Sequence, residues 1–463
     1  MELDFDSIVN YGIKLGAEFI DLRYQEHLYE SIVLDNGVVR DAGVSFTRGL
    51  GVRVIIEGRV GYSFTNIMSD ENLKLTVEKA VKIARYTGSY GSVVSMEARN
   101  MVKDRIVSHY GIDPFDIDYT EKIEILNLVH KKLREFKEIS SITLPYAFEK
   151  DRRVYVSSNG DFVDFTRRMI GFGLRLVAHS NNTYESLSVS ESTVGGWEFL
   201  KAFKLEEYAA SNARLLIESL TAPHVHPGRY DIVLDNEMVG LMLHEAFGHA
   251  TEGDIVEAGG SVLAGRIGEQ VASELVTIVD DGRVPGGVYV PYDDEGTPKL
   301  KVFTVENGVL KSFLHSRSTA RSLGGIPTGN ARVMSYNHSI LVRQTNTYML
   351  PRDWGVEEMI RDMKRGIYVK GKGALGGEVN PSTGSFTFTS GPSYIIENGE
   401  PVKLVKGVML SGAILDTLKR VDAVGKDLVV KTSVFGGCGK SGQMVRVGDG
   451  GPHVRVRGFV LGG

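Results

Sequence analysis

Hydrophobic spacing divides the first half of the chain into helical and strand segments. Apolar residues recur at helical spacing over residues 5–17 and 73–86, so a helix is predicted in each. The segments between them are strand-like, at residues 19–27, 30–43 and 49–64. Asn36-Gly37 tolerates positive φ at both positions and predicts a two-residue hairpin turn, and Gly58 predicts a second turn. The chain is therefore expected to begin with a helix, a run of hairpin strands and a second helix.

This arrangement recurs weakly further along the chain. Asn36-Gly37 precedes a Gly-x-Gly-x-Arg strand at residues 48–54, and Asn159-Gly160 precedes the same pattern at residues 170–176. Each strand is followed by a helical pattern, the second at residues 206–220. The Gly-x-Gly pairs lack the third glycine and the helix start of a dinucleotide site, so they indicate close packing of strands. Two related α/β domains are predicted, at residues 1–103 and 104–222.

The pattern changes after a linker at residues 221–228, which is rich in residues that break helices and strands. One helical segment, residues 235–249, is followed by many short strand-like segments separated by glycine turns. Residues 228–463 are therefore predicted to form a mostly β domain, shaped like a barrel or a sandwich. The predicted fold class is α+β, with N-terminal α/β units that contain an internal hairpin-plus-helix repeat.

Composition and charge narrow the class of protein. The 463 residues suggest two or three domains, and 54 of them are glycine, well above the usual ~7%. The single cysteine cannot form an internal disulfide, which favours a reducing compartment. A net charge of -5 without a dense basic run disfavours nucleic-acid binding. The acidic start and the absence of a stretch of about 18 apolar residues predict no membrane segment, so we expect a soluble cytoplasmic protein.

The strongest candidate for chemistry is an HExxxH motif, in which His244 and Glu245 are followed by His249. The histidines are five residues apart, whereas the HExxH motif of zinc proteases places them four apart. On a regular α-helix, side chains five apart point about 140° away from each other. Gly248 allows the helix to bulge or end there, which would turn His249 back toward His244. Taken alone, the motif also fits a polar helix end with two surface histidines.

The lone cysteine completes a candidate metal site. Cys438 lies in the glycine-rich segment 434–442, where the backbone and a thiolate can approach another element closely. Two imidazoles and one thiolate form a three-ligand Zn²⁺ set that leaves a fourth position for water, as in catalytic zinc sites. Glu245 would then act as the general base on that water. An inert cysteine in a turn is the alternative.

Other polar residues near the motif are weaker candidates. Glu252 and Asp254 follow it closely and could orient His249, or they could be surface acids. Lys440 beside the thiol could stabilise an oxyanion, although a solvated lysine is the default. The histidines at positions 224 and 226 could bind a metal, but their place in the linker favours a solvent-exposed pair.

Taken together, these segments resemble the TldD branch of the TldD/PmbA family of metallopeptidases over essentially the whole chain. The resemblance rests on five segments: HEAFGHATEGD (244–254), TGNAR (328–332), TNTYM (345–349), residues 376–399 and GGCGKSGQ (436–443). It implies that His244, His249 and Cys438 bind one zinc ion per chain and that Glu245 is catalytic. It further implies unfolded or short peptides as substrates, and a TldE/PmbA-like companion subunit in a heterodimer, with a homodimer as the alternative.

Two β-prone runs, residues 344–348 and 385–390, are polar at alternate positions. A strand edge near the metal could pair with an extended peptide through main-chain hydrogen bonds, so Asn346, Thr387 and Thr389 are predicted to bind substrate. The predicted function is a zinc-dependent peptidase. Two rivals remain: a cysteine hydrolase with Cys438 as nucleophile and a motif histidine as base, and a non-catalytic scaffold subunit that binds peptides.

Overall fold

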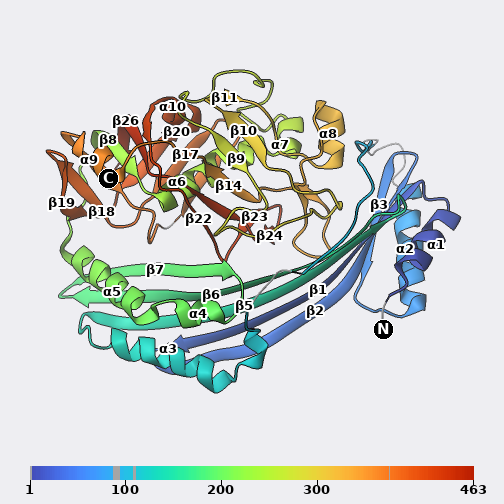
Figure 1. Cartoon of the computed structure of the whole chain (residues 1–463), viewed down its shortest axis with the longest axis horizontal. Coiled ribbons are helices and arrows are strands. Elements are labelled where there is room, and N and C mark those ends of the chain that lie inside the picture. The colour runs from blue at the N-terminus through green and yellow to red at the C-terminus, as the bar shows by residue number, and fades with distance from the viewer. Residues whose placement is uncertain (1–2, 87–93, 108–110, 375, 463) are drawn as a thin grey trace.

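A long, curved, mostly antiparallel sheet underlies a β-rich C-terminal half (Figure 1). The computed structural model describes residues 3–86, 94–107, 111–374 and 376–462. The first seven strands are β1 (Phe19–Asp35), β2 (Val38–Ile56), β3 (Arg59–Thr65), β4 (Lys103–Val107), β5 (Ile139–Ser157), β6 (Phe162–Ser180) and β7 (Thr183–Val194). They form one sheet in the order β3-β2-β1-β5-β6-β4, with β7 also paired to β6.

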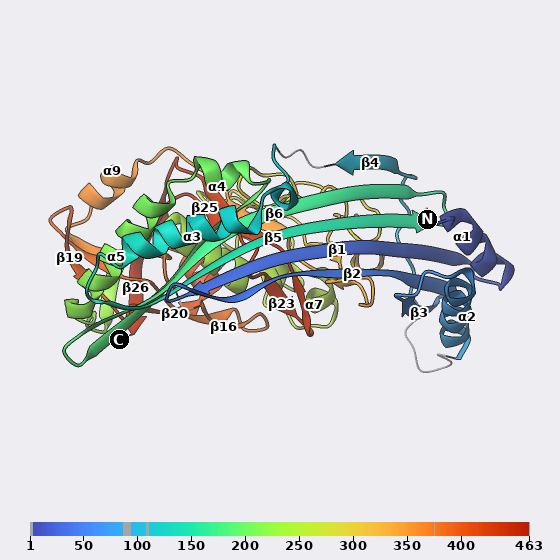
Figure 2. The same cartoon turned by 90° about the horizontal axis from the view of Figure 1, so that it is seen from below.

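Helices cover the two ends of this sheet. The helices of this half are α1 (Phe5–Lys14), α2 (Asp70–Tyr86), η1 (Pro114–Asp116), α3 (Tyr119–Leu133), α4 (Glu198–Ala202) and α5 (Leu205–Thr221). One core is formed where α1 and α2 pack on the sheet at one end, and another where α3 and α5 pack on it at the other end. Viewed from below, the long strands run between these two groups of helices (Figure 2).

The two predicted N-terminal units are joined through a single sheet. The β1–β2 hairpin and the β5–β6 hairpin meet where β1 pairs antiparallel with β5, from Asp21 opposite Ser157 to Asp35 opposite Thr143. The two predicted turns are confirmed, because Asn36 and Gly37 have φ of 49° and 83°, and Gly58 has φ of 71°. The predicted boundary after residue 103 falls at the start of β4, which also pairs within this sheet, and the three-domain division stays a prediction.

The described part of the C-terminal half contains two larger sheets and two short strand pairs. Its strands are β8 (Gly228–Leu234), β9 (Ile278–Asp280), β10 (Val302–Glu306), β11 (Val309–Leu310), β12 (Ala331–Arg332), β13 (Leu341–Val342), β14 (Asn346–Met349), β15 (Arg365–Val369), β16 (Gly376–Asn380), β17 (Ser385–Thr389), β18 (Ser393–Glu397), β19 (Glu400–Val405), β20 (Met409–Ala413), β21 (Val421–Val424), β22 (Val429–Thr432), β23 (Cys438–Lys440), β24 (Gln443–Val445), β25 (Gly448–Gly451) and β26 (Val454–Gly462). The described strands form a six-stranded sheet, β11-β10-β9-β14-β25-β22, a nine-stranded sheet, β16-β17-β20-β26-β8-β15-β18-β19 with β21 on β26, and the pairs β12–β13 and β23–β24. The predicted α+β class with a mostly β C-terminal half is confirmed.

A helical segment packs in the core shared by these two sheets. The helices of this half are α6 (Asn236–Met242), η2 (Leu243–Phe247), η3 (Gly248–Thr251), α7 (Gly253–Glu257), α8 (Arg317–Leu323), α9 (Val356–Arg361) and α10 (Ile414–Lys419). Val239 and Phe247 pack in one core with Ile278 of the six-stranded sheet and Ile232 of the nine-stranded sheet. The segment that carries the HExxxH motif is therefore held from both sides. None of the described helices is long and apolar enough to cross a membrane.

One buried histidine in this half makes stability depend on pH. His315 is 3% exposed and lies 3.3 Å from Thr319 through its Nδ1 atom. Burial lowers the pKa of His315 to about 4, whereas an unfolded histidine titrates near 6.5. Between these values the unfolded state binds more protons, so the free energy of unfolding falls as pH is lowered from about 6.5 to 4.

Replacing His315 with Gln should remove this dependence. Lowering the pH from 7 to 5 is expected to cost the wild type about 2 kcal/mol through this group, and the variant none of it. Thermal unfolding at the two pH values measures the difference. His226→Gln, at an exposed position, is the control and should leave the wild-type dependence in place. Equal acid sensitivity in wild type and His315→Gln would contradict the assignment.

Candidate metal centre

The HExxxH motif does not lie on a regular α-helix. Asp235 caps α6 by accepting a hydrogen bond from the Met238 backbone N–H at 2.9 Å. After Met242 the helix widens into the π-helical turn η2 and then tightens into the 3₁₀ turn η3. Because π-helical hydrogen bonds join residues five apart, this widening brings His244 and His249 onto one side. Their ring centroids are 5.3 Å apart.

Cys438 joins the two histidines from the other end of the domain. It is the first residue of β23, which forms a short hairpin with β24. Its Sγ atom lies 3.3 Å from His249 Nε2, although the two residues are 189 positions apart in sequence. The ligand atoms of His244, His249 and Cys438 all lie within 4.8 Å of one another, and the three side chains are buried. The structure therefore brings together the three residues that the sequence proposed as ligands.

These residues fit a zinc ion in chemistry as well as in spacing. Neither ring nitrogen of the buried His244 has a hydrogen-bond partner among the described residues. Buried polar atoms are normally paired, so a bare imidazole in this position needs an explanation, and a metal ion supplies one. Burial alone would raise the pKa of Cys438, but His244 and His249 lower it to about 5. The thiolate, the form that binds metals, is therefore favoured at neutral pH.

Acidic and basic side chains fix the orientation of the second histidine. Glu252 Oε2 lies 3.0 Å from His249 Nδ1, so the Nε2 atom faces Cys438. Burial alone would raise the pKa of Glu252, but His249 and Lys440 lower it. Lys440 donates to Glu252 at 2.9 Å, to Asp254 at 2.7 Å and to the Val342 carbonyl at 2.9 Å. With all three of its N–H groups engaged, Lys440 supports Glu252 and is not free to stabilise an oxyanion.

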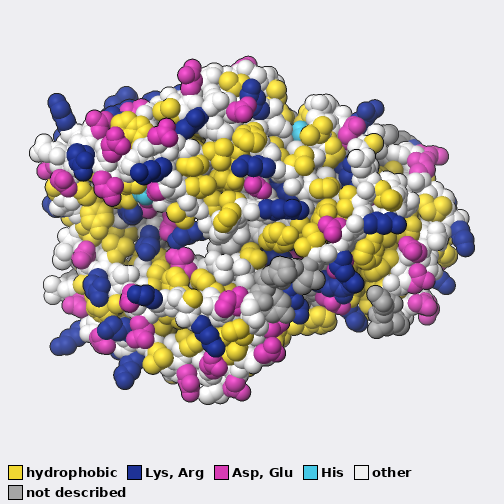
Figure 3. All heavy atoms as spheres, in the orientation of Figure 1, with side chains coloured by type: hydrophobic (Ala, Val, Ile, Leu, Met, Phe, Trp, Pro, Cys, Tyr) yellow, Lys and Arg dark blue, Asp and Glu magenta, His cyan; other side chains and the backbone are white. Residues whose placement is uncertain are grey.

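Glu245 faces a cavity of about 640 Å³ that also reaches His244 and Cys438. Its carboxylate lies 3.9 Å from His249 Nε2 and its side chain is 36% exposed, so it is open to solvent beside the candidate ligands. In the space-filling view the molecule is hollowed between the N-terminal sheet and the C-terminal half, and acidic and basic side chains are intermixed over this face (Figure 3). The cavity can admit a substrate beside the cluster.

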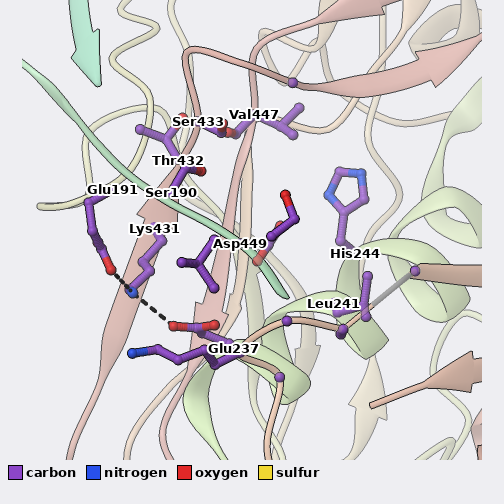
Figure 4. Close-up of a pocket in the computed structure, with 18 of the residues that line it drawn as sticks. Ser190, Glu191, Glu237, Leu241, His244, Lys431, Thr432, Ser433, Val447 and Asp449 are labelled. Atoms are coloured by element: carbon purple, nitrogen blue, oxygen red, sulfur yellow. Dashed lines mark hydrogen bonds and ion pairs between the residues drawn. The ribbon is translucent and has the colours of Figure 1, made fainter. Parts of the chain in front are cut away.

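Several residues of the cavity carried no signal in the sequence. Lys431 Nζ lies 2.8 Å from both Glu191 and Glu237, and Figure 4 shows this trio across the cavity from His244. Asp449 also lines the cavity, and burial raises its pKa to about 6. These residues come from β7, α6, β22 and β25, and only the folded chain places them around one space.

Gln344, which the sequence did not single out, supports the π-helical turn. Its side-chain amide donates to the His244 carbonyl at 3.0 Å. A Cβ atom added to Gly248 would lie 1.8 Å from Gln344 Oε1. Gly248 has an ordinary helical φ of -59°, so glycine is required there for space and not for backbone freedom. The predicted bulge is confirmed: the π-helical turn Leu243–Phe247 ends at Gly248 and realigns His249.

The predicted substrate residues lie elsewhere. Asn346 is fully buried, and its side-chain amide binds the backbone of Asp281 and Val288. Thr387 and Thr389 are not among the described residues that line the cavity. Pairing of a peptide with these strands is not available, because β14 lies between β9 and β25 and β17 lies between β16 and β20. The alternating pattern marked interior strands, not an exposed edge.

The linker histidines are not part of the cluster either. In the part of the chain that the structure describes, the cluster of three candidate metal ligands contains neither His224 nor His226. His224 forms an isolated bridge to Lys406, and both histidines are exposed. This agrees with the solvent-exposed pair that the linker setting favoured.

Comparisons with known proteins agree with this geometry. Three family models match, described as the PmbA/TldA metallopeptidase C-terminal domain (residues 227–463), domain 1 (20–84) and central domain (112–220). A metalloprotease of Methanothermobacter thermautotrophicus is 35% identical over 100% of both chains. A zinc metalloprotease TldD homologue of Saccharolobus solfataricus is 29% identical over 97% of this chain and 98% of its own. The crystal structure of TldE from Thermococcus kodakarensis matches with a TM-score of 0.80 at 18% identity, over 99% and 100% of the chains.

Proposed function

Since the chain belongs to the PmbA/TldD metallopeptidase family and is a metalloprotease, we propose that it is a zinc-dependent peptidase acting on unfolded or short peptides. The observation that carries the proposal is the convergence of His244, His249 and Cys438 within 4.8 Å, beside a cavity that Glu245 lines. A zinc metalloprotease among the full-length relatives supports the choice of metal. Imidazole and thiolate ligands favour zinc on the same ground.

Each residue of the site has a distinct task in this proposal. His244, His249 and Cys438 would hold one zinc ion, which when bound would acidify a water molecule and polarise the scissile carbonyl. Glu245 accepts the proton of the attacking water at its carboxylate and later returns it to the leaving amine. Glu252 holds His249 through Nδ1 and keeps Nε2 available as a ligand atom. Lys440 keeps Glu252 ionised, which preserves this orientation.

One observation favours this function over a cysteine hydrolase. A cysteine–histidine pair leaves the second buried histidine unexplained, since neither nitrogen of His244 has a hydrogen-bond partner among the described residues. A purely structural scaffold would not need a carboxylate open to the cavity beside the ligands.

The cavity suggests how peptides are held without strong sequence preference. Strand β16 is an edge of the nine-stranded sheet, since it pairs only with β17 among the described strands. Gly376, its first residue, lines the cavity, and β16 contacts the η2 turn that carries His244. An extended peptide can add to such an edge through main-chain hydrogen bonds. We therefore propose that the substrate pairs with β16, in place of the interior strands expected at first.

Hydrolysis of an unfolded polypeptide by the zinc-loaded protein tests this function. We expect cleavage of an unfolded chain but not of its folded form, loss of cleavage after chelation, and recovery when zinc is added back. A peptide carrying N-methyl groups on alternate amides should bind at least about 10-fold more weakly than its unmodified parent, because it cannot pair with the edge. Activity that survives chelation and is lost on alkylation of Cys438 would favour the cysteine hydrolase. Full turnover of the N-methylated peptide would overturn the pairing with β16 and leave the zinc assignment standing.

We also propose that the chain works with a second subunit. TldE of Thermococcus kodakarensis has the same fold, which supports a companion of this architecture. A heterodimer with such a TldE/PmbA-like subunit and a homodimer are the two forms to be distinguished. Co-purification with the companion from the native source, compared with the mass of the chain expressed alone, separates them.

A further inference from the structure

A second cavity, of about 360 Å³, lies between the N-terminal sheet and the hairpin β23–β24. Four arginines line it: Arg153 on β5, Arg167 on β6, Arg332 on β12 and Arg446 just after β24. No described residue lines both this space and the cavity beside Glu245. We call it the arginine cavity.

Carboxylates balance only part of this charge. Glu149 and Asp151 line the arginine cavity as well. Arg167 lies 3.2 Å from Glu149 and 3.0 Å from Asp151, and Arg446 lies 2.6 Å from Glu149. Arg153 lies 2.9 Å from Asp151 and also binds Asp294 at 2.8 Å. The three arginines thus share three acids, which makes this part of the wall neutral.

Arg332 has no acidic partner of its own. It donates to the carbonyls of Gln344 and Arg446, at 2.5 and 2.6 Å. The neighbouring Arg343, which is fully buried, likewise donates to backbone carbonyls, those of Cys438 and Gln443. Buried charges are normally paired, because an unpaired ion loses its hydration without compensation.

Two further properties show that these arginines lack some of their partners. Burial, together with repulsion by Arg167, Arg343 and Arg153, lowers the pKa of Arg332 to about 9, and the attraction of Asp294 offsets only part of this. The Nε atom of Arg167 has no hydrogen-bond partner among the described residues, although Arg167 is only 5% exposed. A negatively charged group with several acceptor oxygens would compensate the charge of Arg332 and accept a hydrogen bond from Arg167 Nε.

We propose that the arginine cavity binds a small phosphate-containing anion, held by Arg332 and Arg167. Guanidinium groups recognise phosphate through paired N–H donors, and the anion would supply the negative charge that the wall lacks. The cavity is at the small end of the range for ligand pockets and exceeds what inorganic phosphate fills, so a small phosphomonoester fits as well. Glu149 and Asp151 do not prevent this, because each is already paired with arginine.

This anion site is linked to the hairpin that carries Cys438. Arg446 donates to the Gly436 carbonyl at 2.7 Å, two residues before Cys438, and its own carbonyl accepts from Arg332. Arg343 donates to the carbonyl of Cys438, the first residue of β23, and to that of Gln443, the first residue of β24. An anion that stabilises these arginines therefore stabilises the hairpin, whatever reaction the metal centre performs.

Thermal unfolding of the purified full-length chain tests the site. Inorganic phosphate and glycerol phosphate are each titrated against chloride at equal ionic strength. We expect a saturable rise of about 2–4 °C in Tm with phosphate and one binding site per chain by calorimetry. A larger rise with glycerol phosphate at equal concentration identifies an organic phosphate as the better occupant, and equal rises identify the phosphate group alone. No rise beyond that in chloride overturns the proposal.

Three variants locate the effect. Thr47→Glu puts a carboxylate on the exposed rim of the cavity and keeps all four arginines, so it should abolish the phosphate response without lowering the basal Tm. Ser45→Glu, on the same strand and the same face but outside the lining residues, should keep the response. Cys438→Ser should also keep it, which separates this site from phosphate binding at the metal. A response that persists in Thr47→Glu, or disappears in Cys438→Ser alone, contradicts the assignment.

Discussion

Replacing Glu245 with Gln is expected to abolish peptide hydrolysis while leaving the metal in place. The amide keeps the size of the side chain but cannot accept a proton from water, and loss of a general base typically lowers kcat by a factor of about 10²–10⁴. His244, His249 and Cys438 are untouched, so zinc content should stay at about one ion per chain. Peptidase assays and metal analysis of the same preparation measure both quantities.

The matched control for this experiment is Glu257→Gln. Glu257 is the last residue of α7, is exposed and does not line the cavity. It should keep wild-type kcat and KM. If Glu245→Gln retained full activity, Glu245 would not be the general base. If the variant lost activity together with its zinc, the cause would be a structural effect on the turn that carries His244.

The second large effect is expected for Cys438→Ser. Removing one of three ligands should lower zinc affinity by more than the 10–100-fold seen when only a supporting residue is lost, so the purified variant should contain little zinc and show no cleavage. Because Cys438 is the only cysteine of the chain, its state can be read directly by thiol titration. With zinc bound the thiol should be protected, and after chelation it should react readily at pH 7, since its pKa is about 5.

A cobalt-substituted protein provides an independent measurement. Thiolate coordination should produce a charge-transfer band in the wild type that is absent in Cys438→Ser. His226→Gln, which changes an exposed histidine outside the cluster, should keep both the metal and the band. Full metal content in Cys438→Ser would show that the thiol is not a ligand and would favour the cysteine hydrolase, in which Cys438 is the nucleophile.

The sequence predicted the local features of this protein well. The turn at Asn36-Gly37 follows from two residues that accept positive φ, and the second turn follows from the glycine at position 58. The HExxxH motif and the single cysteine correctly indicated the three residues that lie together in the structure. These features depend on neighbours in the chain or on the chemistry of single residues, which a sequence displays directly.

Spatial neighbours were harder to predict. Alternating polarity at residues 344–348 and 385–390 was read as an exposed edge, but both strands are interior and Asn346 is buried. A strand pattern tells which side chains share a face, not which strands flank it.

The sequence by itself therefore determined which residues could bind a metal, where the main turns lie and that the chain is mixed α and β. The tertiary structure decided how a five-residue histidine spacing works: a π-helical turn, supported by Gln344, aligns His244 with His249. It also decided that Cys438 reaches His249 across 189 residues, and that Glu252 and Lys440 fix the orientation of His249. These outcomes rest on through-space contacts between distant segments, whose free energies depend on the assembled fold and leave no local pattern in the chain.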